Sequence, residues 1–206
     1  MRGPASERVR QVLTDTVALG QGCREAIGNA RRCLAEGDEV LALRMVAADQ
    51  EIDRRTATIE AQVLLILTLT PPLAGDLRRV VAVFKCVTDL ERIGDYAVHA
   101  ARAVVGPGER RAPADVVTMA GHAEAMVTGA VDALAREDAD LAREVIRRDD
   151  RVDRLLVRLR RASEGEAAGH PWLAAARSLE RAADHAVNVA QWAAYAAEGE
   201  RPTIVV

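Results

Sequence analysis

The sequence predicts an all-α protein made of two tandem, pseudo-symmetric three-helix bundles with six long helices. The 206-residue chain is 50% hydrophobic but only 2% aromatic, and its commonest residues favour helices rather than the alternating β-branched and aromatic residues of sheets. Glycine, proline and aspartate divide the chain into long stretches free of helix breakers. The two halves of the chain also resemble each other, which indicates a duplicated unit.

Three helices are predicted in the first half, over residues 6–36, residues 38–70, and from the proline pair to about residue 105. Gly37 is typical of the position just beyond a helix C-terminus. Asp38 is a favourable N-cap for the helix that follows it. Pro71 and Pro72 then turn the chain between the second and third helices.

The string Gly106-Pro107-Gly108 is the strongest break in the sequence. It predicts the boundary between a first bundle, residues 1–106, and a second bundle, residues 107–206. Asp138 is the counterpart of the first N-cap and opens the fifth helix. The helices predicted in the second half cover residues 113–136, 138–162 and 172–198.

Two pairs of segments carry the internal resemblance. Residues 33–54 align without gaps to 133–154, at an offset of 100, and residues 90–99 align to 179–188, at an offset of 89. The drop in offset means that the second half has fewer residues between its paired segments. If these segments lie on antiparallel neighbouring helices, the second half has a shorter hairpin and its motifs still face each other.

Carboxylates interrupt the apolar positions of the predicted helices at matching places in both halves. Leu77, Phe84, Glu91 and Val98 follow at intervals of seven and share one helix face, so Glu91 takes an otherwise apolar position. Asp95 lies one turn further along this face. Each half presents Asp-x-x-x-Asp on one helix and Glu-x-x-x-Asp on the next, formed by Asp49, Asp53, Glu91 and Asp95 in the first half and by Asp149, Asp153, Glu180 and Asp184 in the second.

Four carboxylates that converge between packed helices repel one another and require positive charge nearby. Hard metal ions such as Mg, Mn, Ca or iron suit oxygen-rich sites, and His99 or Asn188, one turn further along, can add a ligand. Arginine is the other neutralising group, because each motif adjoins one, namely Arg54, Arg92, Arg154 and Arg181. A solvated helix face or structural Glu–Arg pairs give the same pattern, so the residues alone leave both interpretations open.

Composition excludes several other classes of protein. The net charge of −3 and the scarcity of aromatic residues argue against binding of nucleic acid. Three cysteines without a CxxC spacing fit a reducing compartment, and the polar N-terminus is unlike a signal peptide. The most apolar run, residues 61–73, is too short and too interrupted to span a bilayer. We therefore expect a soluble, cytoplasmic protein.

The motifs resemble those of the PhoU family over nearly the whole chain, from about residue 7 to residue 200. The two ERxxD segments are LERIGDYAV at 90–98 and LERAADHAVN at 179–188. Upstream of them stand ADQEIDRRTATIE at 48–60 and RDDRVDRL at 148–155, and the turn PPLAGDLRR at 71–79 is similar to the family's Pro-x-x-x-Asp-Leu-Arg segment.

The resemblance implies a cytoplasmic accessory protein of phosphate uptake and a negative regulator of the phosphate-starvation response. It implies two partners, the ATPase subunit of the phosphate ABC transporter and the phosphate-sensing histidine kinase, as well as a homodimer. It also implies that iron, zinc, manganese or magnesium binds the four carboxylate motifs. Gln50, where an acidic residue is common, and His99, where the second half has Asn188, depart from the pattern in the first half.

Two other functions fit parts of the same pattern. A di-metal carboxylate enzyme on a helical bundle typically uses Glu-x-x-His on two helices, and no such motif occurs in this sequence. We therefore expect no enzymatic activity. A purely structural helical protein, with its acidic faces as docking surfaces, differs from the regulator mainly in binding no metal.

Overall fold

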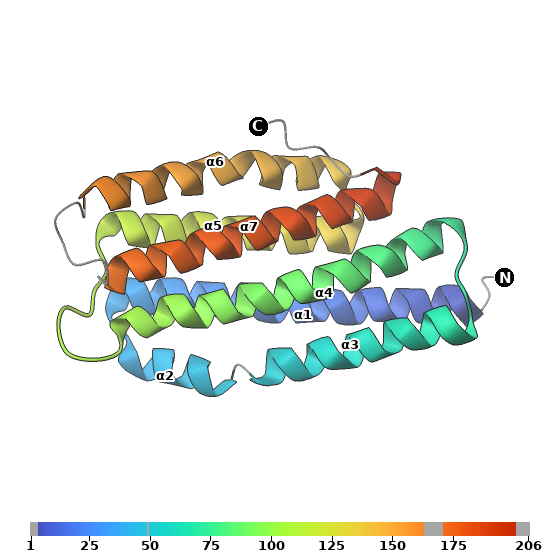
Figure 1. Cartoon of the computed structure of the whole chain (residues 1–206), viewed down its shortest axis with the longest axis horizontal. Helices are drawn as coiled ribbons and strands as arrows, with labels where there is room; N and C mark the ends of the chain where they lie inside the picture. The colour runs from blue at the N-terminus through green and yellow to red at the C-terminus, as the bar shows by residue number, and fades with distance from the viewer. Residues whose placement is uncertain (1–3, 49, 163–170, 201–206) are drawn as a thin grey trace.

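A computed structural model describes residues 4–48, 50–162 and 171–200, and the regular elements in these ranges are all helical (Figure 1). They are α1 (Pro4–Glu36), α2 (Glu39–Ala48), α3 (Gln50–Leu69), α4 (Ala74–Ala101), the 3-10 turn η1 (Arg102–Val104), α5 (Ala114–Arg136), α6 (Ala139–Ala162) and α7 (Pro171–Glu198). The all-α fold class is confirmed. The helix predicted over 38–70 is described as α2 and α3, on either side of Asp49, which lies outside the described residues.

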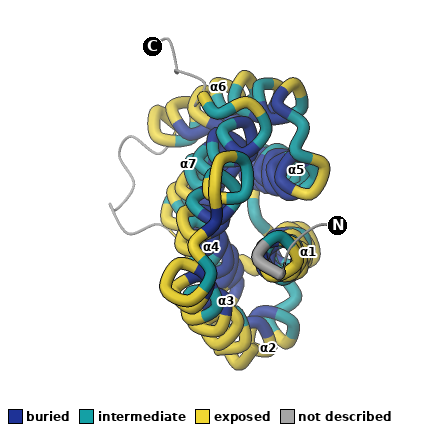
Figure 2. Tube along the Cα trace, turned by 90° about the vertical axis from the view of Figure 1, so that its right-hand side faces the viewer, coloured by how far each residue is buried: buried dark blue, intermediate teal, exposed yellow. Residues whose placement is uncertain are grey.

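Four helices, α1, α4, α5 and α7, form the centre of the molecule (Figure 2). In this centre α4 packs on α7 and α1 packs on α5, so the two halves of the chain meet along both pairs. Among the described elements, α6 packs only on α5 and α7, and α3 packs only on α1, α2 and α4. The helices α3 and α6 therefore lie at opposite edges of the molecule (Figure 1).

The turns between the first two helices of each half are built alike. Gly37 has a φ of +72°, a left-handed conformation that glycine adopts without strain. Asp38 accepts a hydrogen bond at Oδ1 from the backbone N–H of Leu41 at 2.9 Å, and Asp138 accepts the equivalent bond from Leu141 at 3.0 Å. Both predicted N-caps are thus present.

The hairpin of the second half is shorter, as the change in offset predicts. From Asp53, α3 continues to Leu69, whereas α6 ends at Ala162, soon after Asp153. The returning helix is shortened by a similar length, because α4 begins at Ala74, well before Glu91, whereas α7 begins at Pro171, much nearer to Glu180. The motifs therefore stay opposite each other in both halves.

Small residues allow the central helices to pack closely. A Cβ atom at Gly20 of α1 would lie 2.8 Å from a methyl of Val131 on α5, closer than such atoms approach. The buried side of α7 is largely alanine, formed by Ala175, Ala176, Ala182, Ala183, Ala186, Ala190, Ala193, Ala194 and Ala196. Buried residues of both halves join into one hydrophobic cluster, and the division into two units at residue 106 stays a prediction.

Candidate functional site

The four carboxylates predicted in the second half lie together on neighbouring helices, Asp149 and Asp153 on α6, Glu180 and Asp184 on α7. Burial raises the pKa of Asp149 to about 6, and the negative charges of the other three reinforce the shift. The four carboxylates are thus near enough for their charges to act on one another, and we call them the second cluster.

Arginine partly neutralises this second-half cluster. Arg181 donates a hydrogen bond to Asp184 at 3.3 Å and lies 3.5 Å from a carboxylate oxygen of Glu180. Burial nevertheless raises the pKa of both carboxyls above their ordinary values. One oxygen of Asp149, Oδ1, is buried without a hydrogen-bond partner among the described residues. The cluster thus retains repulsion and an unsatisfied oxygen.

The cluster in the first half is built from Asp53 on α3 and from Glu91 and Asp95 on α4. Burial raises the pKa of Glu91, and the nearby carboxylates add to the effect. Arg92 opposes the shift, and it donates to Asp95 at 3.1 Å. Asp49, the fourth residue predicted for this site, lies outside the described residues.

One residue of the first cluster was missed from the sequence. The charge of Glu60 on α3 also raises the pKa of Glu91, and Glu60 lies two turns beyond Asp53 on the same helix face. Its counterpart at an offset of 100 is Arg160, which lowers the pKa of Glu180 in the second cluster. The spacing of seven residues between Asp53 and Glu60 could have predicted that Glu60 belongs to this cluster. The two clusters therefore differ in charge at one matching position.

The donor chemistry of the clusters suits a hard cation, because carboxylate oxygens are the ligands that such ions prefer. However, in the three described ranges no three His, Cys, Asp or Glu side chains are arranged to hold a metal ion. Arginine is in contact with both clusters. The described side chains therefore fit the arginine-neutralised form.

A second polar group links the two halves where α4 meets α7. Asp89 of α4 accepts a hydrogen bond from the amide of Asn188 at 3.0 Å and lies 2.8 Å from Nδ1 of His185. Tyr96 stacks on the ring of His185, with centroids 5.7 Å apart. Asn188, which the sequence placed near the metal site, thus bonds across the interface, and Asp89 was not anticipated because its partners lie on the other half.

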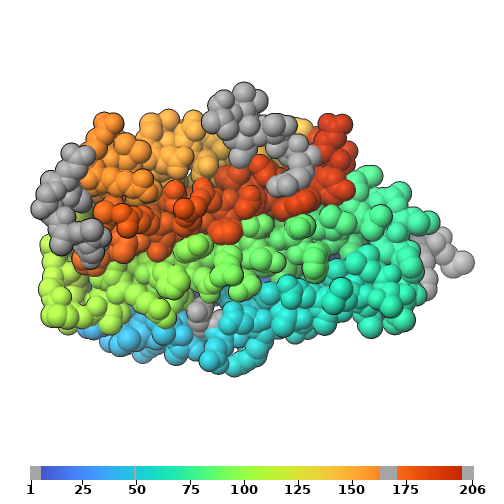
Figure 3. Space-filling model, viewed as in Figure 1, coloured from blue at the N-terminus to red at the C-terminus, as the bar shows by residue number. Residues whose placement is uncertain are grey.

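Large apolar side chains are exposed on the hairpin of α3 and α4. We define the hairpin face as Leu64, Leu65, Leu67, Leu69, Leu73, Leu77 and Phe84, with exposed fractions between 41% and 82%. Figure 3 shows α3 and α4 side by side on one face of the molecule. The heptad pattern treated Leu77 and Phe84 of α4 as apolar positions like Val98, which is buried, but both are 41% exposed.

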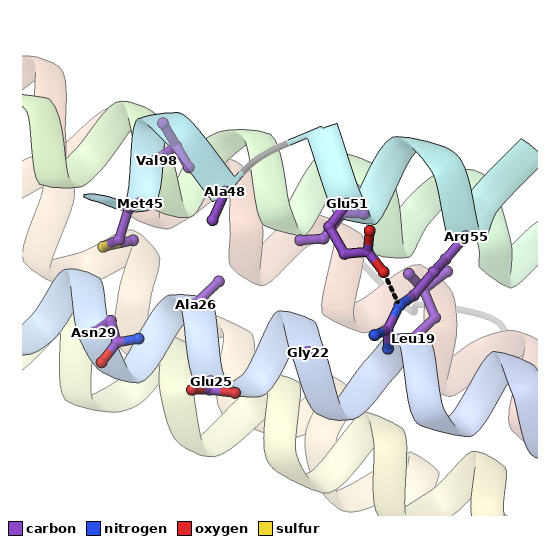
Figure 4. Close-up of a pocket in the computed structure, with 11 residues that line it drawn as sticks. Leu19, Gly22, Glu25, Ala26, Asn29, Met45, Ala48, Glu51, Arg55 and Val98 are labelled. Carbon is purple, nitrogen blue, oxygen red and sulfur yellow. Dashed lines mark hydrogen bonds and ion pairs between the residues drawn. The ribbon is translucent and has the colours of Figure 1, made fainter. Parts of the chain in front are cut away.

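A pocket of about 290 Å³ opens between α1, α2 and α3 (Figure 4). Arg55 donates to Glu51 at 2.9 Å beside it. Asn29 and Met45 line this pocket. Their counterparts in the second half, at an offset of 100, are Gly129 and Val145. There a Cβ atom at Gly129 would lie only 2.7 Å from Val145. The matching helices of the second half therefore approach more closely than those of the first.

Comparison with known proteins decides the family. The model of the PhoU domain matches residues 16–104 and 116–193, on either side of the glycine-rich break. The chain belongs to the PhoU family. Its carboxylate clusters are the ERxxD and upstream acidic motifs by which the sequence resembles that family.

This chain aligns with most of the length of its relatives in the PhoU family. The phosphate-specific transport system accessory protein PhoU homolog of Pseudomonas aeruginosa is 32% identical, with 93% of this chain and 84% of the relative aligned. The protein of the same name from Pseudomonas putida is 31% identical, with 93% and 79% aligned.

Two solved PhoU structures share the fold. The crystal structure of PhoU from Pseudomonas aeruginosa has a TM-score of 0.84 at 31% identity, and the alignment covers 94% of this chain and 99% of the other. The crystal structure of the phosphate transport system regulatory protein PhoU from Streptococcus pneumoniae has a TM-score of 0.89 at 24% identity, covering 97% and 100%. The second likeness concerns the fold alone.

None of the helices that the structure describes combines the length and the apolar character needed to cross a membrane.

Proposed function

We propose that this PhoU family member is a cytoplasmic accessory protein of phosphate uptake and a negative regulator of the phosphate-starvation response. It serves as a docking adaptor between the ATPase subunit of a phosphate ABC transporter and a phosphate-sensing histidine kinase. The accessory role named for its relatives supports the choice of system. The observation that carries the adaptor role is the exposed hairpin face.

The hairpin face has the properties of a docking surface. Large apolar side chains gathered on the exposed surface of one hairpin are uncommon on proteins that act alone and mark sites of protein association. Leu73, at the turn between α3 and α4, is 82% exposed, and Leu77 and Phe84 extend the surface along α4. A partner that covers these side chains removes them from water, and the hydrophobic effect stabilises the complex.

The first carboxylate cluster adds charge to this surface. Phe84 and Glu91 are seven residues apart on α4 and share one face, so the apolar face leads into the acidic cluster. Charge complementarity favours partners with basic side chains at this point and speeds the encounter. The hairpin face and the first cluster together select a partner segment that is apolar at one end and basic at the other.

The adaptor role is tested by a pull-down from phosphate-replete and phosphate-starved cells. The wild-type chain is compared with L73S/L77S and with the matched control V40S/L43S, whose residues on α2 are 59% and 52% exposed. We expect the wild type and the control to recover the transporter ATPase or the histidine kinase, and the hairpin variant to lose both. Failure of the wild type to recover either protein in both conditions contradicts the proposal.

Homodimerisation is a further part of the proposal. The hairpin face is available to a second copy of the chain as well as to other proteins. Sedimentation velocity of the wild type and of L73S/L77S measures this directly. A monomer at all concentrations for the wild type argues against a homodimer and leaves the adaptor role untouched.

Binding of a divalent or trivalent metal ion by the carboxylate clusters is also proposed. The all-oxygen donors, the unpartnered oxygen of Asp149 and the mutual repulsion of the carboxylates support it. Iron, zinc, manganese and magnesium are the candidates, and each requires the carboxylates to come closer together, because no three of the described side chains are arranged to hold a metal ion. Elemental analysis of protein prepared without chelator, compared with D149A/E180A, provides the test. Equal metal content in both proteins counts against these ligands.

The adaptor role requires no catalysis. A di-metal carboxylate enzyme remains the alternative function. Such an enzyme would convert a substrate, whereas an adaptor would not. We expect the metal-loaded protein to show neither oxidase nor phosphatase activity. Turnover that disappears in D149A/E180A would instead make the clusters an active site.

A further inference from the structure

Five arginines form a row along the outer side of α6. We call them the arginine row, and they are Arg147, Arg151, Arg154, Arg158 and Arg161. Alternating intervals of four and three residues keep them on one stripe of an α-helix, and all five are exposed. At 1.5 Å per residue the row is about 21 Å long.

The arginine row is weakly neutralised by the rest of the protein. Arg154 approaches Asp150, and Arg158 approaches Asp115 of α5, each at 3.9 Å, while the two arginine side chains stay 68% and 66% exposed. Arg147 and Arg161 form no ion pair with another residue of the described ranges. Exposed pairs at this distance contribute little to folding, so the row is available to an external anion.

The row is confined to one half of the duplicated chain. At an offset of 100, the paired positions on α2 and α3 are Ala47, Glu51, Arg54, Thr58 and Ala61. The first half therefore forms the same helix hairpin without a line of positive charge. Packing of the bundle therefore does not require the row.

A shallow hollow borders the row. Asp153, Arg154, Val157, Arg158 and Arg161 line it, and Val157 is 46% exposed. The aliphatic stems of the arginines cover apolar surface while their guanidinium groups stay in water. The hollow therefore suits an apolar side chain whose neighbours on the same segment are carboxylates, since guanidinium and carboxylate groups form the stronger, charge-assisted hydrogen bonds.

We propose that the arginine row binds an acidic, amphipathic α-helix of a partner protein. The helix lies along α6, places carboxylates against the guanidinium groups and inserts an apolar side chain beside Val157. A partner helix that carries acidic residues at intervals of three and four residues matches the spacing of the arginines in the row. Asp115 and Asp153 border the row on two sides, so the positive strip is narrow and suits a linear segment better than a flat anionic bilayer.

This proposal goes beyond the adaptor function because it assigns a second surface, at the edge opposite the hairpin face (Figures 1 and 2). Two ligands on opposite edges do not exclude each other sterically. The row can therefore be tested whether or not the hairpin face binds its own partner.

The test is a fluorescence anisotropy titration of the full chain with a synthetic, end-capped helical peptide. The peptide has glutamate at alternating intervals of three and four and one central leucine, and a second peptide has glutamine in place of every glutamate. We expect the acidic peptide to bind more tightly at low salt than at high salt. In R151Q/R154Q/R158Q its affinity is expected to fall about tenfold or more, because three charge pairs are lost.

The matched control is R8Q/R10Q/R24Q, which removes three exposed arginines from α1 and is expected to keep the wild-type affinity. Circular dichroism verifies that both variants are folded. Equal affinity of the row variant and the wild type overturns the proposal, as does equal binding of the two peptides. Row-dependent binding to phosphatidylglycerol vesicles without binding of the acidic peptide also overturns it, in favour of a membrane surface.

Discussion

Replacing Asp149 with asparagine is expected to stabilise the metal-free protein at neutral pH and to leave its stability unchanged in acid. The pKa of Asp149 is about 6 in the folded chain, against an ordinary value of 3.8. An acid with the higher pKa in the folded state binds more protons there, so stability falls as the pH rises from about 4 to about 6 and stays reduced above it. Asparagine carries no charge and lacks this penalty.

The size of the effect follows from the pKa difference. A shift of about two pKa units corresponds to nearly 3 kcal/mol, at about 1.4 kcal/mol per unit. Asp149 is only partly buried, and solvent screening reduces the penalty to about 1–2 kcal/mol. For a chain of 206 residues, this gain raises the midpoint of thermal unfolding by about 2–8 °C.

The assay is urea unfolding of the wild type and D149N in chelator, once at neutral pH and once below the ordinary pKa of aspartate. The matched control is D150N, because Asp150 is the neighbouring residue and its side chain is 81% exposed. We expect the control to stay within about 0.5 kcal/mol of the wild type. The reasoning is refuted if D149N is no more stable than the wild type at neutral pH, or if its gain persists in acid.

Substitutions at three further residues probe contacts between the helices and at one turn. R79A removes the paired hydrogen bonds to Glu137 at 2.7 and 2.9 Å and is expected to lower the unfolding free energy by about 1 kcal/mol, whereas R79K, which cannot form both bonds, should recover only part of it in urea titrations. G37A places a Cβ at positive φ, 2.9 Å from Arg110, and should destabilise by about 1–2 kcal/mol; an unchanged urea midpoint contradicts the assigned strain. D89A removes the carboxylate that accepts from Asn188 and His185 across α4 and α7, and we expect it to lower the free energy of unfolding by about 1–2 kcal/mol. Calorimetry measures the change, and an unchanged stability would mean that water replaces the carboxylate.

Local signals in the sequence were sufficient for most of the helices. Gly37 and Asp38 end one helix and begin the next through interactions within a few residues, so their effect can be predicted from the sequence alone. The same holds for Asp138 and for the proline pair before α4. The change in offset between repeats also predicted the shorter second hairpin, because chain length limits the helices directly.

Features that depend on distant residues were less accessible. The heptad spacing places Leu77 and Phe84 on one face of α4, but it does not tell whether another helix covers that face. Glu60 of α3 belongs to the first cluster because its charge acts on Glu91 of α4. Asp89 of α4 accepts a hydrogen bond from Asn188 of α7. Such contacts follow from how the helices pack against each other, within one half for Glu60 and between the halves for Asp89, and a single sequence does not state this packing. The carboxylate motifs could be predicted because they occur at matching positions in both halves of the duplicated sequence.

The uninterrupted hydrophobic cluster has a mechanical consequence. Protein interiors are packed as densely as organic crystals and compress little, and here one such interior extends through both halves, from α3 to α6. A push against either edge is therefore carried through the central helices to the other edge as a movement of the whole body. The duplicated halves therefore respond to force as one body, with the two proposed contact surfaces at its opposite edges.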